Sequence, residues 1–288
     1  SYAIYHEYVD VIKNYNAGES FSVTTEKLDS LASVSIKSSD YLQFLFLKNE
    51  VANLYKHKGK FIKSYSELKK SMQTFRSSHD TIHIEYFTSL RLLRTNLHNI
   101  RNMPGKSDFK GRSENEIFNS QFAILDSLNE KGEPLRNTLV DYGLSLFRKG
   151  ETSEAIETLH RARSLSLKAN DLASLALSDY SIITNLPASY DLVKTKNEVL
   201  KADIELFEKK ESSIPVKFYN AYFYTLVGSN YYEYFNNLDS AIVYSQKTIS
   251  LLESLKYPAH SIKAATHGNL SKYYSEKGDT NKVWRNVK

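Results

Sequence analysis

One arrangement of residues occurs four times in this chain of 288 residues. Each copy begins with a small residue, and a large residue follows three positions later. A Gly or Asn comes four positions after the large residue, and another small or short residue comes five positions after that Gly or Asn. The four turn residues are Gly59, Gly150, Asn236 and Gly278. Gly and Asn readily take the left-handed conformation that ends a helix, and small residues let antiparallel helices approach closely. The arrangement therefore predicts helix hairpins whose large residue fills the space between the two helices.

The composition and the positions of the prolines favour an all-α fold. The chain has 10 Gly and 5 Pro, too few for an all-β protein, which needs a turn signal every ~8–12 residues. Long 3.6-residue periodicity predicts fourteen helices in seven antiparallel pairs, with every proline between two periodic stretches. The expected helices cover residues 3–16, 23–36, 40–57, 60–77, 80–101, 113–130, 134–149, 152–169, 171–186, 189–210, 215–235, 238–255, 259–277 and 280–288. The long connection over residues 102–112 is basic and is a candidate functional loop.

The predicted hairpins resemble the tetratricopeptide repeat (TPR). The stretches Leu238–Ile249 and Glu154–Ala162 are similar to the second-helix signature of that family. The resemblance implies a right-handed α-solenoid, formed as a single array over residues 1–288, in which each hairpin covers the apolar face of the next. The repeats are longer than the family period of ~34 residues, because Ala155 and Ala241 are 86 residues apart across two repeats, or 43 each.

The repeat style, rich in Tyr, Lys, Asn and Ser, is similar to that of the TPR sensor regions of Bacteroidota signalling regulators. This resemblance implies a protein- or peptide-binding module that serves as the sensory or scaffolding region of a signal-transduction regulator, attached to a histidine kinase or a DNA-binding transcription regulator. Because the last expected helix is cut short at Lys288, we expect the chain to be a piece of a longer protein. The compartment stays open between periplasm and cytoplasm, with the periplasm favoured for a membrane-bound regulator. The alternative is a stand-alone intracellular adaptor or chaperone-like scaffold, and homodimerisation is open for both.

By the same resemblance, the ligand groove is lined by first-helix residues displaced from the packing positions. Carried onto this sequence, the predicted groove consists of Asn49, Asn53, Lys56, His57, Val140, Leu144, Phe147, Arg148, Phe223, Leu226, Asn230, Glu233, Tyr234, Gly268, Lys272 and Ser275. Asn53 with Lys56 suits a peptide backbone or a terminal carboxylate. Aromatic rings beside Asn suit an extended peptide, because rings give contact area and amides fix the backbone. The basic run from Lys56 to Lys70 indicates either a site for an acidic group or a solvated hairpin tip.

The sequence gives little support for other functional classes. The absence of Cys excludes disulfides and thiolate catalysis, and no phosphate-binding loop or nucleophile motif occurs. His79 and His83 have the i, i+4 spacing of a zinc site, which leaves a metal enzyme as the weakest hypothesis beside helix capping. We therefore expect that the chain is not an enzyme and that it binds neither a cofactor nor a metal ion. The net charge of +5 is mild and interspersed with acidic residues, so it predicts no direct nucleic-acid binding, and no window predicts a membrane span.

Overall fold

The structure, a computed structural model, describes the chain except residues 1, 187–189, 211–212, 256–258 and 288. All regular secondary structure in the described residues is helical. In chain order the helices are α1 (Tyr2–Asn16), α2 (Phe21–Lys37), α3 (Tyr41–His57), α4 (Phe61–Arg76), α5 (Ile84–Arg101), α6 (Glu114–Ser127), α7 (Glu133–Lys149), α8 (Thr152–Lys168), α9 (Leu172–Asn185), α10 (Tyr190–Lys209), α11 (Ile214–Glu233), α12 (Leu238–Ser254), α13 (His260–Glu276) and α14 (Thr280–Val287). The all-α prediction is confirmed. The predictions at Pro187, Pro258 and Lys288 fall outside the described residues.

The observed helix ends lie within two residues of the predicted ones, with two exceptions. Helix α5 begins at Ile84 and not at residue 80, because His83 is its N-cap and the Nδ1 atom of His83 accepts a hydrogen bond of 3.3 Å from the Glu85 amide. Helix α6 ends at Ser127 and not at residue 130, because the chain reverses at Asn129, which has a φ of 49°. Both errors come from local hydrogen bonding and backbone conformation that the apolar periodicity does not report.

The helix hairpins close as the repeated residues predict. The four predicted turn residues have φ angles between 48° and 81°, which confirms their role in ending a helix. The small residues sit where helices cross. A Cβ atom on Gly143 would lie 2.7 Å from the Cγ atom of Leu159, closer than two carbon atoms can pack. In the second pair the Ser64 hydroxyl donates a hydrogen bond of 2.6 Å to the Ala52 carbonyl of the facing helix.

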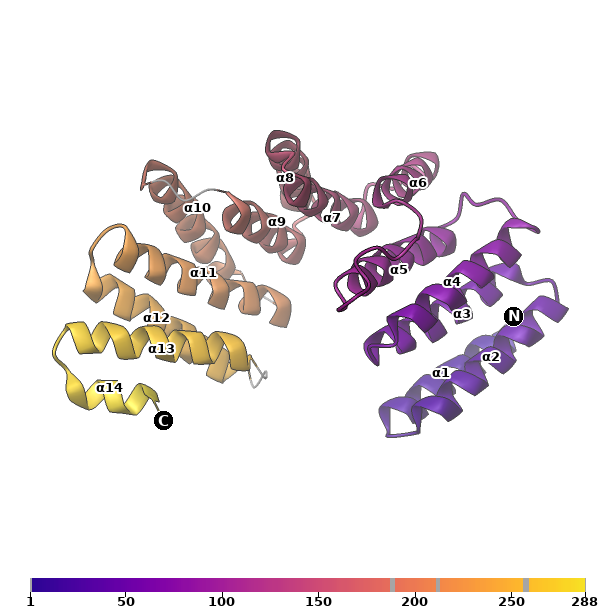
Figure 1. Cartoon of the computed structure of the whole chain (residues 1–288), viewed down its shortest axis with the longest axis horizontal. Coiled ribbons are helices and arrows are strands. Elements are labelled where there is room, and N and C mark those ends of the chain that lie inside the picture. The colour runs from indigo at the N-terminus through magenta and orange to yellow at the C-terminus, as the bar shows by residue number, and fades with distance from the viewer. Residues whose placement is uncertain (1, 187–189, 211–212, 256–258, 288) are drawn as a thin grey trace. The chain divides into compact units, whose positions relative to one another are not determined.

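The chain divides into two compact units, residues 1–134 and residues 135–288. Unit 1 contains α1 to α6 and the first two residues of α7, and unit 2 contains the rest of α7 and α8 to α14. In unit 1, each helix from α2 to α6 contacts the helix before it, and α5 also contacts α3 (Figure 1). In unit 2, α8 contacts α9, and consecutive contacts run from α9 to α14. Each unit is therefore a stack of helix hairpins, and one continuous array over both units stays a prediction.

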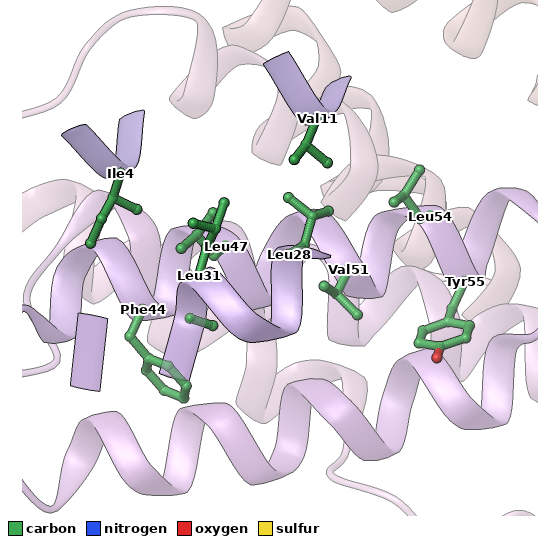
Figure 2. Close-up of a cluster of buried hydrophobic side chains, with 10 residues drawn as sticks. Ile4, Val11, Leu28, Leu31, Phe44, Leu47, Val51, Leu54 and Tyr55 are labelled. Carbon is green, nitrogen blue, oxygen red and sulfur yellow. The ribbon is translucent and has the colours of Figure 1, made fainter. Parts of the chain in front are cut away.

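The core of unit 1 shows how the apolar stripes of neighbouring helices are used. Side chains from α1, α2 and α3 interlock in one buried cluster (Figure 2), which consists of Ile4, Val11, Leu28, Leu31, Ala32, Phe44, Leu47, Val51, Leu54 and Tyr55. Most members recur three or four positions apart within a helix, which is the spacing of one helix face. No hairpin could cover this cluster alone, since it draws on the first two pairs together.

The core of unit 2 is more aromatic. The buried Phe207 of α10 stacks on the buried Phe223 of α11 with ring centroids 6.0 Å apart. Tyr224 is also buried. Tyr231 is half-buried, packs against the same cluster, and stacks on Tyr244 of α12 at 5.6 Å. The aromatic density of the sixth pair thus serves mainly to join α11 to its neighbours.

Candidate ligand-binding surfaces

Two predicted groove residues of unit 1 lie near the C-terminal end of α3. Asn53 and Lys56 are half-buried and three positions apart, so their side chains share one face of the helix. Burial and the positive charge of Arg91 on α5 lower the pKa of the Lys56 amino group, and the charge of Glu50 opposes this shift. We call the surface formed by Glu50, Asn53, Lys56 and Arg91 the α3–α5 face.

Glu50 is a carboxylate whose charge acts on Lys56. Burial raises the pKa of Glu50, whereas a hydrogen bond from the Tyr8 hydroxyl and the charge of Lys56 lower it. On the Tyr8 side of that contact, burial, followed by the Glu50 charge, raises the pKa of Tyr8 to about 12. Helix α1, which carries Tyr8, therefore borders the face as well. The four residues that define the α3–α5 face include two cations and one carboxylate, and this excess of cations suits an acidic ligand group. Glu85 on α5 lies near Glu50, whose charge contributes to the raised pKa of Glu85.

Asn49, predicted to line the groove, is instead part of the packing between α3 and α5. Its side chain is 2% exposed. Its Nδ2 atom donates a hydrogen bond of 3.0 Å to the Glu85 carbonyl, and the Ser89 hydroxyl lies 2.7 Å from its Oδ1 atom. The Nδ2 and Oδ1 atoms of Asn49 thus both have hydrogen-bond partners inside the protein. This is the usual state of a buried amide, since an unpaired one would be destabilising. The assignment of Asn49 to an accessible groove is corrected accordingly.

The predicted groove residues of unit 2 divide in the same way. Phe223 is fully buried in the aromatic core described above, so it is not available to a ligand, which corrects its assignment. A large aromatic residue on an amphipathic helix serves equally well as core or as contact surface, and here it is core. Asn230 is half-buried, and its Nδ2 atom donates a hydrogen bond of 3.0 Å to the Asn197 side chain on α10. It joins α10 to α11.

Lys272 lies on an aromatic surface between α11 and α13. Its Nζ atom is 4.3 Å from the centre of the Tyr232 ring, and that ring is 4.7 Å from the Tyr273 ring. The Tyr232 hydroxyl donates to the Glu276 carboxylate. Burial raises the pKa of Tyr273, and the charge of Glu233 adds to this effect. Lys272 already has a cation–π partner, so this surface is less suited to an anion than the α3–α5 face.

Val140, also predicted to line the groove, is 1% exposed and belongs to the core, so its assignment is corrected as well. Other predicted groove residues keep part of their side chains at the surface. Half-buried are Asn53, Lys56, Phe147, Asn230 and Tyr234, and exposed are His57, Arg148, Glu233 and Lys272. Within unit 1 the structure brings Asn53, Lys56 and His57 together at the end of α3. Within unit 2 it places Glu233 and Lys272 on the two helices around Tyr273. Whether these residues form a binding groove stays a prediction.

The histidine pair considered for a metal site does not share a helix face. His79 precedes α5 and packs against the rings of Tyr41 and Phe75, with centroids 5.3 Å and 5.4 Å away. His83 caps the start of α5. The i, i+4 spacing has no helical meaning there, since residues 79–83 lie outside the helix. Among the described residues, no group of three or more His, Cys, Asp or Glu side chains is arranged to hold a metal ion.

Unit 2 also contains a cavity of about 520 Å³ between α10, α11 and α12. Its charged lining residues are Glu208, Lys210, Lys217 and Lys247. The Tyr224 hydroxyl donates to the Glu208 carboxylate, and the Lys247 Nζ atom lies 5.4 Å from the centre of the Tyr224 ring. Two of the charged residues that line this cavity, Glu208 and Lys247, thus already interact with Tyr224, which lines it too.

Sequence reasoning missed three members and neighbours of the α3–α5 face: Tyr8, Glu50 and Arg91. Arg91 belongs to the third pair, where the resemblance to the clear repeats is degenerate, so the register of its first helix was not aligned with theirs. Glu50 adjoins the predicted Asn49, and only the packing of α1 on α3 distinguishes the two positions. The feature of the sequence that could have indicated Arg91 is its positive charge on the helix that directly follows a clear hairpin.

A scan against protein-family models and a search of curated proteins give no match. Solved structures do match. A STAND signal-transduction ATPase with a TPR sensor from Pyrococcus horikoshii matches with a TM-score of 0.68 at 15% identity over 99% of this chain, which spans 40% of that protein. TPR-like repeats of a putative kinesin light chain from Podosopora anserina match with a TM-score of 0.50 at 17% identity, over 77% of this chain and 95% of that chain.

The C-terminal part of a TPR repeat-containing protein from Cytophaga hutchinsonii also matches, with a TM-score of 0.50 at 13% identity over 97% of this chain and 92% of that chain. At these identities the likeness concerns the fold. The chain is therefore an all-α solenoid of the TPR type, as the hairpin residues predicted. None of the helices in the described residues has the length and apolar character needed to span a membrane.

Proposed function

We propose that this chain is a protein- or peptide-binding module without a catalytic role, and that its α3–α5 face holds an acidic group of the partner. Stacked helix hairpins offer extended surfaces that serve recognition, which supports the general proposal. The observation that carries the specific one is the presence of two cations, Lys56 on α3 and Arg91 on α5, on helices that contact each other. The half-buried Lys56 amino group is destabilised in its charged form by burial and by Arg91.

An anionic partner group would relieve that unfavourable pairing. A carboxylate bound by the two cations would offset their repulsion with charge-assisted hydrogen bonds, which are about twice as strong as neutral ones. Asn53, one turn before Lys56, adds an amide that can both donate to and accept from a peptide backbone. The exposed His57 follows at the end of the same helix. This set favours an extended peptide with an acidic side chain or a free C-terminus.

We further propose that the module is the sensory or scaffolding region of a signal-transduction regulator. The support is the similarity over 99% of this chain to a STAND protein that carries a TPR sensor, of which this chain spans 40%. A sensor requires an attached output domain, so the sequence of the full gene product tests this part of the proposal. A gene product without any effector domain or membrane anchor contradicts it and favours the stand-alone adaptor.

Selection from a displayed library of random peptides tests the binding proposal. We expect enrichment of peptides with Asp or Glu, or with a free terminal carboxylate, whose binding weakens as salt increases. The Lys56→Ala variant should bind such peptides about tenfold more weakly, as expected for one charge-assisted contact. Lys58→Ala is the matched control, because Lys58 is exposed two residues further on. Enrichment of neutral or basic peptides, or equal loss in the control, contradicts the proposal.

A further inference from the structure

A second surface of unit 1 is separate from the α3–α5 face. A cavity of about 620 Å³ lies between α4, α5 and the connection that follows α5. It is lined by Tyr65, Lys69, Met72, Gln73, Arg76, Tyr86, Leu93, Lys110, Gly111 and Arg112. We call this cavity the basic pocket, because four of its ten lining residues are cations and none of the ten is acidic. Its volume is within the range of ~300–1,000 Å³ that is typical of small-molecule sites.

The basic pocket has an apolar floor and a cationic rim. The floor consists of the buried side chains Tyr65, Met72, Tyr86 and Leu93. The rim is formed by Lys69, Gln73 and Arg76, which follow one exposed stripe of α4 at i, i+4 and i+7, together with Lys110 and Arg112 from the connection. An apolar floor with a charged rim selects a ligand that has both an organic body and an anionic group.

Two guanidinium groups from different segments, Arg76 of α4 and Arg112 of the connection, line the pocket together with Tyr86. Burial raises the pKa of Tyr86, whereas the positive charges of Arg76 and Arg112 lower it. Arg112 is fixed by its neighbours: its Nη2 atom donates a hydrogen bond of 2.6 Å to the Ser120 hydroxyl, and its Nε atom lies 3.9 Å from the Glu116 carboxylate. A guanidinium that is held in place loses less entropy when it binds an anion.

The connection that supplies Lys110 and Arg112 is packed onto the helices. The Phe109 ring meets the Tyr65 ring edge to face at 5.4 Å. A Cβ atom on Gly111 would lie 2.7 Å from the Leu97 Cδ1 atom and 2.9 Å from the Tyr65 hydroxyl, so the backbone approaches both side chains closely. A side chain at position 111 would therefore require the ends of the Leu97 and Tyr65 side chains to shift, and Tyr65 is part of the floor of the pocket.

We propose that the basic pocket binds a small organic phosphate of the size of a nucleoside diphosphate, with the phosphates on Arg76 and Arg112 and the organic part on the apolar floor. Guanidinium groups match phosphate oxygens in a bidentate geometry, and the Tyr86 hydroxyl can add a further donor. Lys69 and Lys110 balance the remaining negative charge. A lone inorganic anion would leave the floor unused, and a cavity of about 620 Å³ exceeds its needs.

Isothermal titration of the whole chain with ADP, pyrophosphate and adenosine tests the proposal. We expect saturable ADP binding that weakens as salt increases, weaker binding of pyrophosphate, and no binding of adenosine at equal concentration. A Lys69→Ala/Arg76→Ala variant should weaken ADP binding at least about tenfold. The matched control Lys58→Ala/Lys70→Ala removes two exposed charges of the same unit that do not line the pocket, and should change affinity less than about twofold.

Two further variants keep the test decisive if the double variant does not fold. Tyr86→Phe removes only a hydroxyl group and should weaken ADP binding several-fold. Gly111→Ala should also weaken it, since the added methyl group requires the Tyr65 side chain in the floor of the pocket to shift. Circular dichroism checks the fold of each variant. No ADP binding at millimolar concentration, equal binding of adenosine, unchanged affinity in Tyr86→Phe and Gly111→Ala, or tighter binding of a phosphotyrosine peptide than of ADP overturns the proposal.

Discussion

Two buried carboxyl groups in unit 2 make the stability of the protein depend on pH. Asp179 of α9 and Asp203 of α10 are 2% and 3% exposed, and they hydrogen-bond to each other. Arg163 of α8 supports the pair: its Nε atom donates 2.7 Å to the Asp179 carboxylate, and its Nη2 atom lies 3.5 Å from the Asp203 carboxylate. The Oδ2 atom of each carboxyl group is buried and has no donor from elsewhere.

One shared proton satisfies this arrangement. Burial, then the charge of Asp179 and the hydrogen bond to it, raise the pKa of Asp203 from 3.8 to about 8. In a buried site, the ionisation of both of two adjacent carboxyl groups beside a single guanidinium is energetically unfavourable. The folded protein therefore holds a proton at Asp203 that the unfolded chain releases near pH 4, and this proton stabilises the fold at acidic pH. The contribution is lost as the pH rises toward about 8.

The magnitude follows from the linkage between proton binding and folding. Each unit of pKa shift corresponds to about 1.4 kcal/mol. Between about pH 6 and about pH 8, the native protein loses roughly 2 kcal/mol of unfolding free energy through this one group. The Asp203→Asn variant should lose none of it. Its amide donates to Asp179 as the protonated carboxyl does, so the variant should match the native protein near pH 6 and exceed it by roughly 2 kcal/mol near pH 8.

Urea denaturation followed by far-UV circular dichroism measures this difference, since urea leaves the ionic strength unchanged. Glu205→Gln is the matched control: it makes the same change two residues further along α10 at an exposed surface pair with Lys209. Titrating groups remote from the Asp179–Asp203 pair contribute nearly equally to all three proteins and cancel in the comparison, so the measured difference belongs to the coupled pair. A variant that follows the native pH dependence, or that is much less stable than the native protein near pH 6, refutes the shared proton.

Four other substitutions test the packing of the units by urea denaturation. Phe223→Ala should cost about 3–5 kcal/mol because it empties a fully buried site, and a cost below ~1 kcal/mol would contradict its place in the core. Gly143→Ala should cost about 1–3 kcal/mol, because its Cβ would meet Leu159 at 2.7 Å, whereas Gly268→Ala, which meets nothing within 4 Å, should be neutral or stabilising by up to about 1 kcal/mol. Asn49→Ala should lower the unfolding free energy by about 1–3 kcal/mol, because it leaves buried groups unpaired. It should leave the affinity for acidic peptides unchanged. A folded variant with weaker peptide binding would show that Asn49 contributes to the site.

The fold was predictable because its determinants are local and repeated. The left-handed turn at Gly59, the close approach at Gly143 and the 3.6-residue spacing are each visible in the sequence, and each has one structural meaning in a helix hairpin. The start of α5 was misplaced because His83 caps the helix with its ring nitrogen, a role that its residue type does not announce. The apolar pattern reports which face is buried and leaves the helix ends to such local contacts.

The candidate site was less predictable because accessibility depends on the neighbouring helix. Asn49 and Asn53 are one turn apart on α3, yet the first lies under the start of α5 and the second stays partly open. Phe223 was misassigned for the same reason, since the sequence does not say which aromatic residues α10 covers. The pairing of Lys56 with Arg91 links residues 35 positions apart, and only the packing of α3 on α5 brings them together.

A double-mutant cycle tests the central claim that Lys56 and Arg91 together hold an acidic group of the partner. The affinity of one selected peptide, prepared with and without its acidic group, is measured for the native protein, Lys56→Ala, Arg91→Ala and the double variant. We predict that each single variant weakens binding of the acidic peptide about tenfold, that the two losses are not additive, and that the neutral peptide binds all four proteins alike. Equal affinity of the acidic peptide for all four proteins would contradict the claim.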